Sequence, residues 1–283
     1  MLERLGYGTQ GRKKPGATSP YLDGVLGSVT CDMDATLTAS YPGSSQSWAN
    51  MIAAPADGSA QADWDVWLGT DGSDESATSP VRDPSFSGTP GTQAAYFYNN
   101  AEGNCFKFKN QSGPTSLLKA HRKTSGGPWW CAIVHYMNTL GVDTFLGGVN
   151  TTGKRGLTIY MNTGGAMQIW DGSSQVAPSV PAYTTGSYHL TIVSCNPTVA
   201  SNNLRVWLNS RSAVTNTWVP VGDAVASSVF YLGAAEGNSG SISSLTNYLY
   251  RIKHFSFGNE LLDDTKASLL IDHLNARHGT TYA

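Results

Sequence analysis

The stretch Trp129-Trp130-Cys131-Ala132-Ile133-Val134-His135-Tyr136-Met137, residues 129–137, decides the fold. It follows Pro128, and almost all of its side chains are apolar. Nine residues of this composition are typical of a strand at the centre of a β-sandwich, where both faces are covered. We therefore expect residues 129–137 to be among the most buried in the chain.

Strand-like runs recur on both sides of this stretch, with turn residues between them. The predicted strands are 46–52, 62–69, 94–98, 104–108, 144–147, 156–161, 167–170, 187–193, 203–209, 228–233 and 247–257. Two hairpins are predicted among them. One joins 94–98 to 104–108 across Gly103, and the other joins 156–161 to 167–170 across the turn at 162–165.

A single helix is expected at 263–278. Asp263 or Asp264 can cap its start, and Gly279 can end it. Its expected buried stripe consists of Ala267, Leu270, Ile271 and Leu274. Many strands without strand–helix alternation predict an all-β, two-sheet antiparallel sandwich. The expected organisation is an extended N-terminal arm over 1–24, followed by one domain over 25–283 that includes the helix.

Several segments, taken in order, resemble a known family. They are 83–89 followed by 94–97, then 204–209, 229–234, 250–252 and 260–264. Their order resembles the concanavalin A-like jelly roll, and specifically the laminin-G-like domains of tailed-bacteriophage structural proteins, over most of 60–283. The resemblance implies a jelly-roll sandwich and a virion protein that is made in the host cytoplasm. It says less about activity, because such folds host lectins, glucanases, receptor domains and inert virion modules.

Composition narrows the classes of partner. Charged residues make up 13% of the 283 residues, the net charge is −2 and the pI is near 6.3. No basic field is available for nucleic acid or an anionic membrane, so neither partner is expected. The sequence shows no apolar run of membrane-spanning length, and its first residues lack the apolar core that a secretory signal would need, so export through such a signal is not expected. Cys31, Cys105, Cys131 and Cys195 are widely spaced and are expected to be buried free thiols, although disulfide pairing stays open.

A glucanase of this fold would need two carboxylates on one strand. Asp63 with Asp65 and Asp32 with Asp34 have the right spacing. We interpret both pairs as the solvated face of a strand. The histidines form no metal pair of the His-x-x-x-His type, and no Gly-x-Ser-x-Gly elbow or phosphate loop occurs. The predicted catalytic set is therefore empty, and the chain is expected not to be an enzyme.

Binding sites have weaker candidates. Asp71, Asp74 and Glu75 offer oxygen ligands for calcium, the one cofactor that the sequence leaves open, but a solvated acidic loop fits them better. For glycan stacking the candidates are Trp170, Trp207 and Trp218, although core packing is the default for a tryptophan.

The N-terminal arm has four basic side chains against one acidic side chain in its first 20 residues. Its candidate attachment residues are Arg4, Tyr7, Arg12, Lys13 and Lys14. The arm is either a solvated terminus or a segment that orders on a neighbouring subunit.

These observations give three functional hypotheses. The first is a non-enzymatic phage virion structural protein, a head-decoration, fibre or tail-associated module that is attached through the arm. Its expected partners are other virion proteins, further copies of the chain as a homo-oligomer, and a cell-surface glycan. The alternatives are a lectin-like carbohydrate-binding module and a glycoside hydrolase of the same fold.

Overall fold

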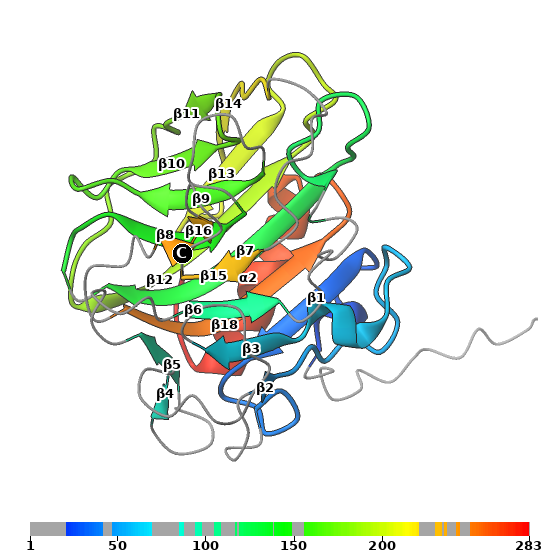
Figure 1. The fold of residues 1–283 in the computed structure, drawn as a ribbon, viewed down its shortest axis with the longest axis vertical. Helices are drawn as coiled ribbons and strands as arrows, with labels where there is room; N and C mark the ends of the chain where they lie inside the picture. The colour runs from blue at the N-terminus through cyan, green and yellow to red at the C-terminus, as the bar shows by residue number, and fades with distance from the viewer. Residues whose placement is uncertain are drawn as a thin grey trace, which may run out of the picture.

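The protein folds as a sandwich of two antiparallel β-sheets with one helix on its outer side (Figure 1). This arrangement confirms the fold class that the sequence predicts. The computed structural model describes residues 21–41, 47–69, 85–87, 94–97, 105–108, 117, 119–137, 139–148, 156–220, 230–233, 235–236, 242–243 and 250–282.

The first sheet contains the stretch that decides the fold as its strand β7. The strand order is β14-β13-β12-β7-β18-β5-β4, and β1 also pairs with β18. The bounds are β1 (Val29–Asp34), β4 (Ser85–Ser87), β5 (Ala94–Phe97), β7 (Trp129–Met137), β12 (Ser187–Cys195), β13 (Leu204–Leu208), β14 (Val214–Asn216) and β18 (Tyr250–Gly258). All of its pairings are antiparallel.

The second sheet has the strand order β11-β10-β9-β8-β15-β6-β3-β2. The bounds are β2 (Ser47–Trp48), β3 (Val66–Gly69), β6 (Cys105–Phe108), β8 (Asp143–Gly147), β9 (Thr158–Met161), β10 (Met167–Trp170), β11 (Gln175–Val176) and β15 (Tyr231–Leu232). A separate pair joins β16 (Ala235–Glu236) to β17 (Ile242–Ser243). Two short 3-10 helices, η1 (Leu22–Gly24) and η2 (Gln61–Trp64), precede β1 and β3.

The main core lies between the two sheets. Side chains alternate along β7, so that Trp129, Cys131 and Ile133 face this core while Trp130 and Val134 face away from it. Eight of the nine β7 residues are buried, as the sequence predicts. The described cysteines Cys31, Cys131 and Cys195 are buried free thiols, and burial raises the pKa of each.

A second hydrophobic layer lies on the outer face of the first sheet, under α2 (Asp264–His278) (Figure 1). The predicted stripe of Ala267, Leu270, Ile271 and Leu274 is buried against it. Asp263 caps the helix by accepting a hydrogen bond from the Lys266 N–H at 2.8 Å, and Gly279 ends it with a φ of 63°. Helix and caps thus follow the sequence prediction closely.

Three local predictions have different outcomes. The hairpin of β9 and β10 is confirmed, with Gly165 at a φ of 80° in its turn. The hairpin of 94–98 with 104–108 is wrong, because β5 lies in the first sheet and β6 in the second. Leu22, placed in the arm by the sequence, is fully buried in the outer layer.

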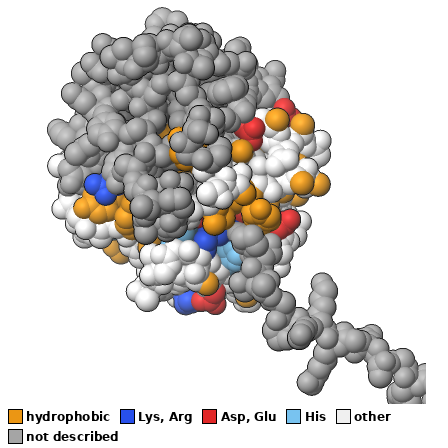
Figure 2. Space-filling view, turned by 90° about the horizontal axis from the view of Figure 1, so that it is seen from below, with side chains coloured by type: hydrophobic (Ala, Val, Ile, Leu, Met, Phe, Trp, Pro, Cys, Tyr) orange, Lys and Arg blue, Asp and Glu red, His pale blue; other side chains and the backbone are white. Residues whose placement is uncertain are grey.

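The surface also bears on partners. None of the described helices combines the length and apolar character that crossing a membrane requires. Figure 2 shows few charged side chains among the described residues of the lower face. Basic and histidine side chains meet hydrophobic ones at one place on it.

Candidate functional site

Five ionisable side chains that are far apart in the sequence meet at the end of α2. Arg277, in the last turn of α2, forms a bidentate ion pair with Asp32 on β1, with both N–O distances at 3.0 Å. Its Nη1 also lies 3.3 Å from Asp34 Oδ2. His278 Nε2 lies 2.9 Å from Asp34 Oδ2, and His254 Nδ1 lies 3.8 Å from the same atom. We call these five residues the buried ion cluster.

The members of the buried ion cluster shift one another's pKa values. Burial disfavours the Asp34 carboxylate, but hydrogen bonds from His254 and His278 outweigh that cost and hold the pKa of Asp34 well below its usual range. Burial also disfavours the Arg277 guanidinium, yet Asp32 and Asp34 raise its pKa. Burial lowers the pKa of His278 despite its contact with Asp34. The cluster therefore favours the Asp34 carboxylate and the Arg277 guanidinium in their charged forms.

Asp34, His254 and His278 also form a group whose ligand atoms lie within 4.8 Å of one another. Nitrogen and oxygen donors of this kind suit a transition metal. However, Arg277 Nη1 lies 3.4 Å from His254 Nδ1 and 3.3 Å from Asp34 Oδ2. The guanidinium already faces the donor atoms that a metal would need, so the residues present do not fit a metal ion.

The sequence interpretation of Asp32 and Asp34 as solvated is wrong. Both side chains have no exposed area, because α2 and the segment around Leu22 cover the outer face of β1. Asp63 and Asp65 do not share a strand either. Asp63 lies in η2, where it accepts a hydrogen bond from the Ala60 N–H, and Asp65 accepts one from the Asn50 N–H just before β3.

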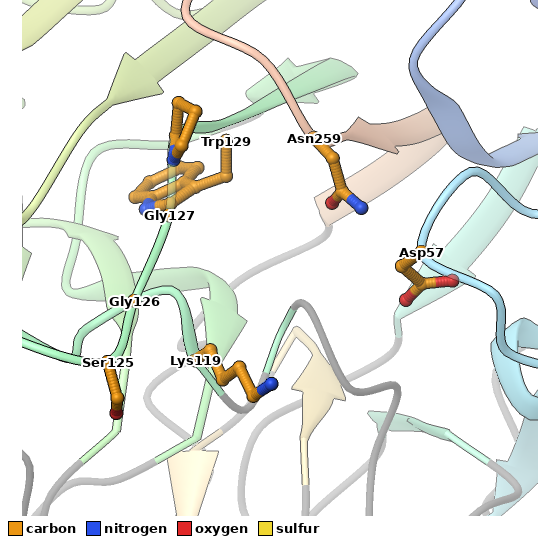
Figure 3. A pocket seen from close by; sticks show the side chains of 8 residues that line it. Asp57, Lys119, Ser125, Gly126, Gly127, Trp129 and Asn259 are labelled. Carbon is orange, nitrogen blue, oxygen red and sulfur yellow. The ribbon is translucent and has the colours of Figure 1, made fainter.

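A hollow of about 300 Å³ opens beside the start of β7. Its described lining residues are Asp57, Lys119, Ser125, Gly126, Gly127, Pro128, Trp129 and Asn259, and we call it the Asn259 hollow. Figure 3 shows the side chains of Asn259, Asp57 and Lys119 directed into the same space. Three separate chain segments thus bring an amide, a carboxylate and an ammonium group together.

Asn259 has the feature that most suggests a ligand. It follows β18, and its backbone N–H donates to Ser28 O at 2.9 Å, which fixes the residue in place. Among the residues that the structure describes, its buried Oδ1 has no hydrogen-bond partner. Leaving such an acceptor unpaired costs about 1–3 kcal/mol. A donor group on a ligand in the hollow would remove that cost.

The rest of the hollow is rigidly built. Asp57 Oδ1 accepts hydrogen bonds from the N–H and the hydroxyl of Ser59. A Cβ at Gly126 would lie 2.2 Å from Arg122 O, so this position requires glycine. A Cβ at Gly127 would meet nothing within 4 Å, which shows open space beside the backbone. Trp129 is 1% exposed, and its Nε1 donates to Ala120 O.

The three tryptophans proposed for stacking lie in different surroundings. Trp207 is 1% exposed under α2, where its Nε1 donates to Asp264 Oδ1 at 2.8 Å. Trp218 is also 1% exposed and packs in the main core. Neither tryptophan can stack on a sugar, because α2 covers the ring of Trp207 and the sandwich core encloses the ring of Trp218. Trp170, at the end of β10, keeps part of its surface exposed.

Other predicted residues lie outside the described part of the chain. These are the calcium candidates Asp71, Asp74 and Glu75, and the attachment candidates Arg4, Tyr7, Arg12, Lys13 and Lys14. Of the buried ion cluster, sequence reasoning singled out only the spacing of Asp32 and Asp34 and interpreted the pair as solvated; it missed the other members and the Asn259 hollow. Both sites combine segments more than 60 residues apart, which no local pattern connects.

No protein family model matches the chain, and no curated protein matches it. Solved structures do match. The match to a Trypanosoma rangeli sialidase covers 92% of this chain and 35% of the sialidase chain, with a TM-score of 0.54 and 12% sequence identity. The match to the binding domain of botulinum neurotoxin serotype C1 covers 88% of this chain and 53% of the toxin chain, with a TM-score of 0.55 and 8% sequence identity. The chain thus spans about a third of the sialidase and about half of the toxin chain.

These matches show the fold, a β-sandwich that is also found in proteins acting on or binding glycans.

The matches also correct one prediction. The chain was expected not to be an enzyme, but the matched structures include sialidases, so this exclusion is wrong. Neither the sialidase nor the toxin binding domain bears on the predicted relation to tailed bacteriophages, which stays a prediction from sequence resemblance.

Proposed function

We propose that this protein is a carbohydrate-binding module and that the Asn259 hollow holds a sugar. The observation that carries the proposal is the unpaired, buried Oδ1 of Asn259 beside the carboxylate of Asp57 and the ammonium of Lys119. A sugar offers neighbouring hydroxyls that both donate and accept hydrogen bonds. Such a ligand can donate to Asn259 and Asp57 while it accepts from Lys119.

The shape of the hollow supports the same class of ligand. Its volume of about 300 Å³ lies at the lower end of the range for small-molecule sites, roughly 300–1,000 Å³. The open space beside Gly127 lets a ligand approach the backbone closely. The edge of the hollow at Pro128 and Trp129 adds apolar surface.

The matched structures add support from the fold. One Trypanosoma rangeli sialidase structure is a complex with sialic acid. For botulinum neurotoxin type C, cell entry depends upon interaction with two ganglioside molecules. Sandwiches of this arrangement therefore occur in proteins that contact glycans. The location of the site has to be argued from the residues of this chain, because a shared fold does not give it.

A glycan array probed with the whole chain tests the proposal, followed by titration of the best neutral oligosaccharide. Asn259→Ala should weaken that binding about tenfold, because a hydrogen bond of the order of 1.4 kcal/mol is lost. Gly127→Trp should fill the hollow and abolish binding. Gly127→Trp should leave the melting temperature nearly unchanged, because a Cβ there meets nothing within 4 Å. Asn259→Ala should keep or raise the melting temperature, because it removes an unpaired buried acceptor.

Lys119 and Lys123 provide a matched pair. Both are exposed lysines in the same turn region, but only Lys119 lines the hollow. Lys119→Gln should weaken binding, and Lys123→Gln should leave it unchanged. If no glycan binds, the function is refuted. If binding survives Gly127→Trp, the hollow is not the site.

A further inference from the structure

The Asn259 hollow lies where β7 begins, next to the end of its neighbour β12. A second hollow lies at the opposite end of this pair of strands. Its volume is about 460 Å³, and its described lining residues are Thr184, Ser187, Tyr188, His189, Asn209, Thr280, Thr281 and Tyr282. We call it the Tyr188 hollow. The pairing of β7 with β12 runs from Trp129 with Cys195 to Met137 with Ser187. Eight residues of strand separate the two ends, or about 26 Å, so the two hollows are distinct.

The described lining of the Tyr188 hollow consists only of hydrogen-bonding side chains. His189 Nδ1 accepts from Asn209 Nδ2 at 2.9 Å, which leaves its Nε2–H to donate to Thr184 O at 2.8 Å. This pattern holds the imidazole neutral, and burial lowers the pKa of His189. Asn209 is fixed in turn, because its Oδ1 accepts from the Leu190 N–H. The floor of the hollow is therefore rigid and uncharged.

A row of aromatic and basic side chains continues from the lining residue Tyr188. Tyr188 on β12 packs edge-on against Tyr136 on β7, with ring centroids 5.2 Å apart. The Lys253 ammonium lies 4.4 Å from the centroid of the Tyr188 ring, and the Arg251 guanidinium lies 4.7 Å from that of Tyr136. Both distances fall within the roughly 6 Å range of cation–π contacts. A ligand against Tyr188 is thus separated from an ammonium by a single ring.

An irregularity in β18 puts Lys253 in this position. The register of β18 against β7 shifts between Ile252 and His254, so Lys253 has no partner on β7. Such a bulge changes the direction of side chains and is common beside functional sites. Ile252 faces the main core, whereas Lys253 and His254 both lie on the outer side. Among the described residues, no carboxylate forms an ion pair with Lys253.

We propose that the Tyr188 hollow is a second ligand site that takes an anionic sugar, with its ring hydroxyls on the uncharged floor and its carboxylate or sulfate near Lys253. The dense set of hydroxyl and amide groups favours a polyhydroxylated ligand over an apolar one. The positive charge at one border, with no acidic side chain among the described lining residues, favours an anion over a cation. This inference concerns a different site from the Asn259 hollow and does not depend on it.

The test is binding of the whole chain to matched sets of one oligosaccharide in neutral, carboxylated and sulfated forms. We expect one or both anionic forms to bind more tightly than the neutral form, with a preference that weakens as salt rises. Lys253→Gln should reduce the affinity for the preferred form about three- to fivefold, because the attraction between the anion and an ammonium on the far side of the Tyr188 ring is lost. Lys253→Arg should keep the preference. Comparing the carboxylated and sulfated forms identifies the anion.

Controls separate this site from the first one and from general charge effects. Lys123→Gln removes an exposed lysine elsewhere and should change nothing. Thr281→Trp should block the Tyr188 hollow without altering charge, while Asn259→Ala should leave the anionic preference intact. Equal affinity for neutral and anionic forms, or no effect of Lys253→Gln and Thr281→Trp, overturns the inference. Anionic binding that survives Gly127→Trp supports it even if the Asn259 hollow binds nothing.

Discussion

The two faces of the first sheet are both buried, but they are stabilised differently. The inner face contributes Cys131, Ile133 and Phe257 to a core that is almost entirely apolar and aromatic. The outer face contributes Trp130, Ala132 and Val134 under α2, and beside them lies the buried ion cluster. The inner layer therefore depends on close packing, and the outer layer depends also on charge neutralisation.

The difference follows from what covers each face. A second sheet covers the inner face, so pleated surfaces interlock over a wide area. A single helix covers the outer face, and its last turn extends past the apolar stripe to β1, where Asp32 and Asp34 lie. Arg277 and His278 in that last turn meet these carboxylates. The outer layer thus links the two ends of the described chain.

The largest effect is expected from a cavity in the inner layer. Phe257 has no exposed area and contacts Trp64 and Trp129, the latter in a stacked geometry with centroids 5.9 Å apart. Phe257→Ala should lower the free energy of unfolding by about 3–5 kcal/mol. Chemical denaturation at neutral pH measures it. A loss below 1 kcal/mol would show that the inner layer can repack.

Removing the cation of the buried ion cluster should cost slightly less. Arg277→Met keeps much of the side-chain volume but leaves the Asp32 and Asp34 carboxylates without their guanidinium. We expect a loss of about 3 kcal/mol, because uncompensated buried charge is strongly destabilising. The same denaturation experiment applies.

A combined variant provides the control for Arg277. Arg277→Met together with Asp32→Asn and Asp34→Asn removes the unpaired charges and should recover part of the lost stability. If the combined variant is no more stable than Arg277→Met alone, the cluster acts through packing and not through charge.

Much of the fold could be predicted because its signals are local. The apolar run of β7, the turn at Gly165 and the Asp263 cap each lie within a few consecutive residues. The hairpin predicted across Gly103 failed for the opposite reason. Two neighbouring strands can pair or can enter different sheets, and that choice depends on contacts with β18 and β3, which are far away in the sequence.

The candidate sites could not be predicted in the same way. Asp32 and Asp34 alternate as a solvated pair would, and only Arg277, more than 240 residues later, shows that they are buried. The Asn259 hollow combines Asp57, Lys119 and Asn259. The position of Lys253 beside the Tyr188 ring depends on a register shift in β18 that no composition signal marks. Sequence patterns report periodicity within an element, whereas these sites arise between elements.

Lowering the pH should show how much each face of the first sheet contributes to the pH dependence of stability. Burial, with repulsion from His189, holds the pKa of His135 on the inner face well below its usual value near 6.5. Burial also lowers the pKa of His278 on the outer face. In both cases the unfolded chain binds a proton that the folded chain does not. Stability should therefore fall as the pH drops below about 6.5.

Asp34 adds to this loss at lower pH. Its folded pKa is depressed, so its stabilisation is present above about pH 4 and is lost as the pH falls further. Denaturation at a series of pH values between 7 and 3 measures both effects. His135→Gln should flatten the curve between pH 7 and 5 more than His278→Gln does. The opposite order would place the main acid sensitivity on the outer face.

The smallest effect is expected at the start of α2, where a single hydrogen bond caps the helix. Asp263→Ala removes the acceptor for the Lys266 N–H and should cost about 0.5–2 kcal/mol. Asp263→Ser keeps an acceptor and should retain most of that stability, as thermal unfolding can show. The neighbouring Asp264 accepts from Trp207 Nε1 and the Ala213 N–H, so it can hold the helix while the cap is lost. If Asp263→Ala costs as much as Arg277→Met, the outer layer depends on the cap as strongly as on its charge cluster.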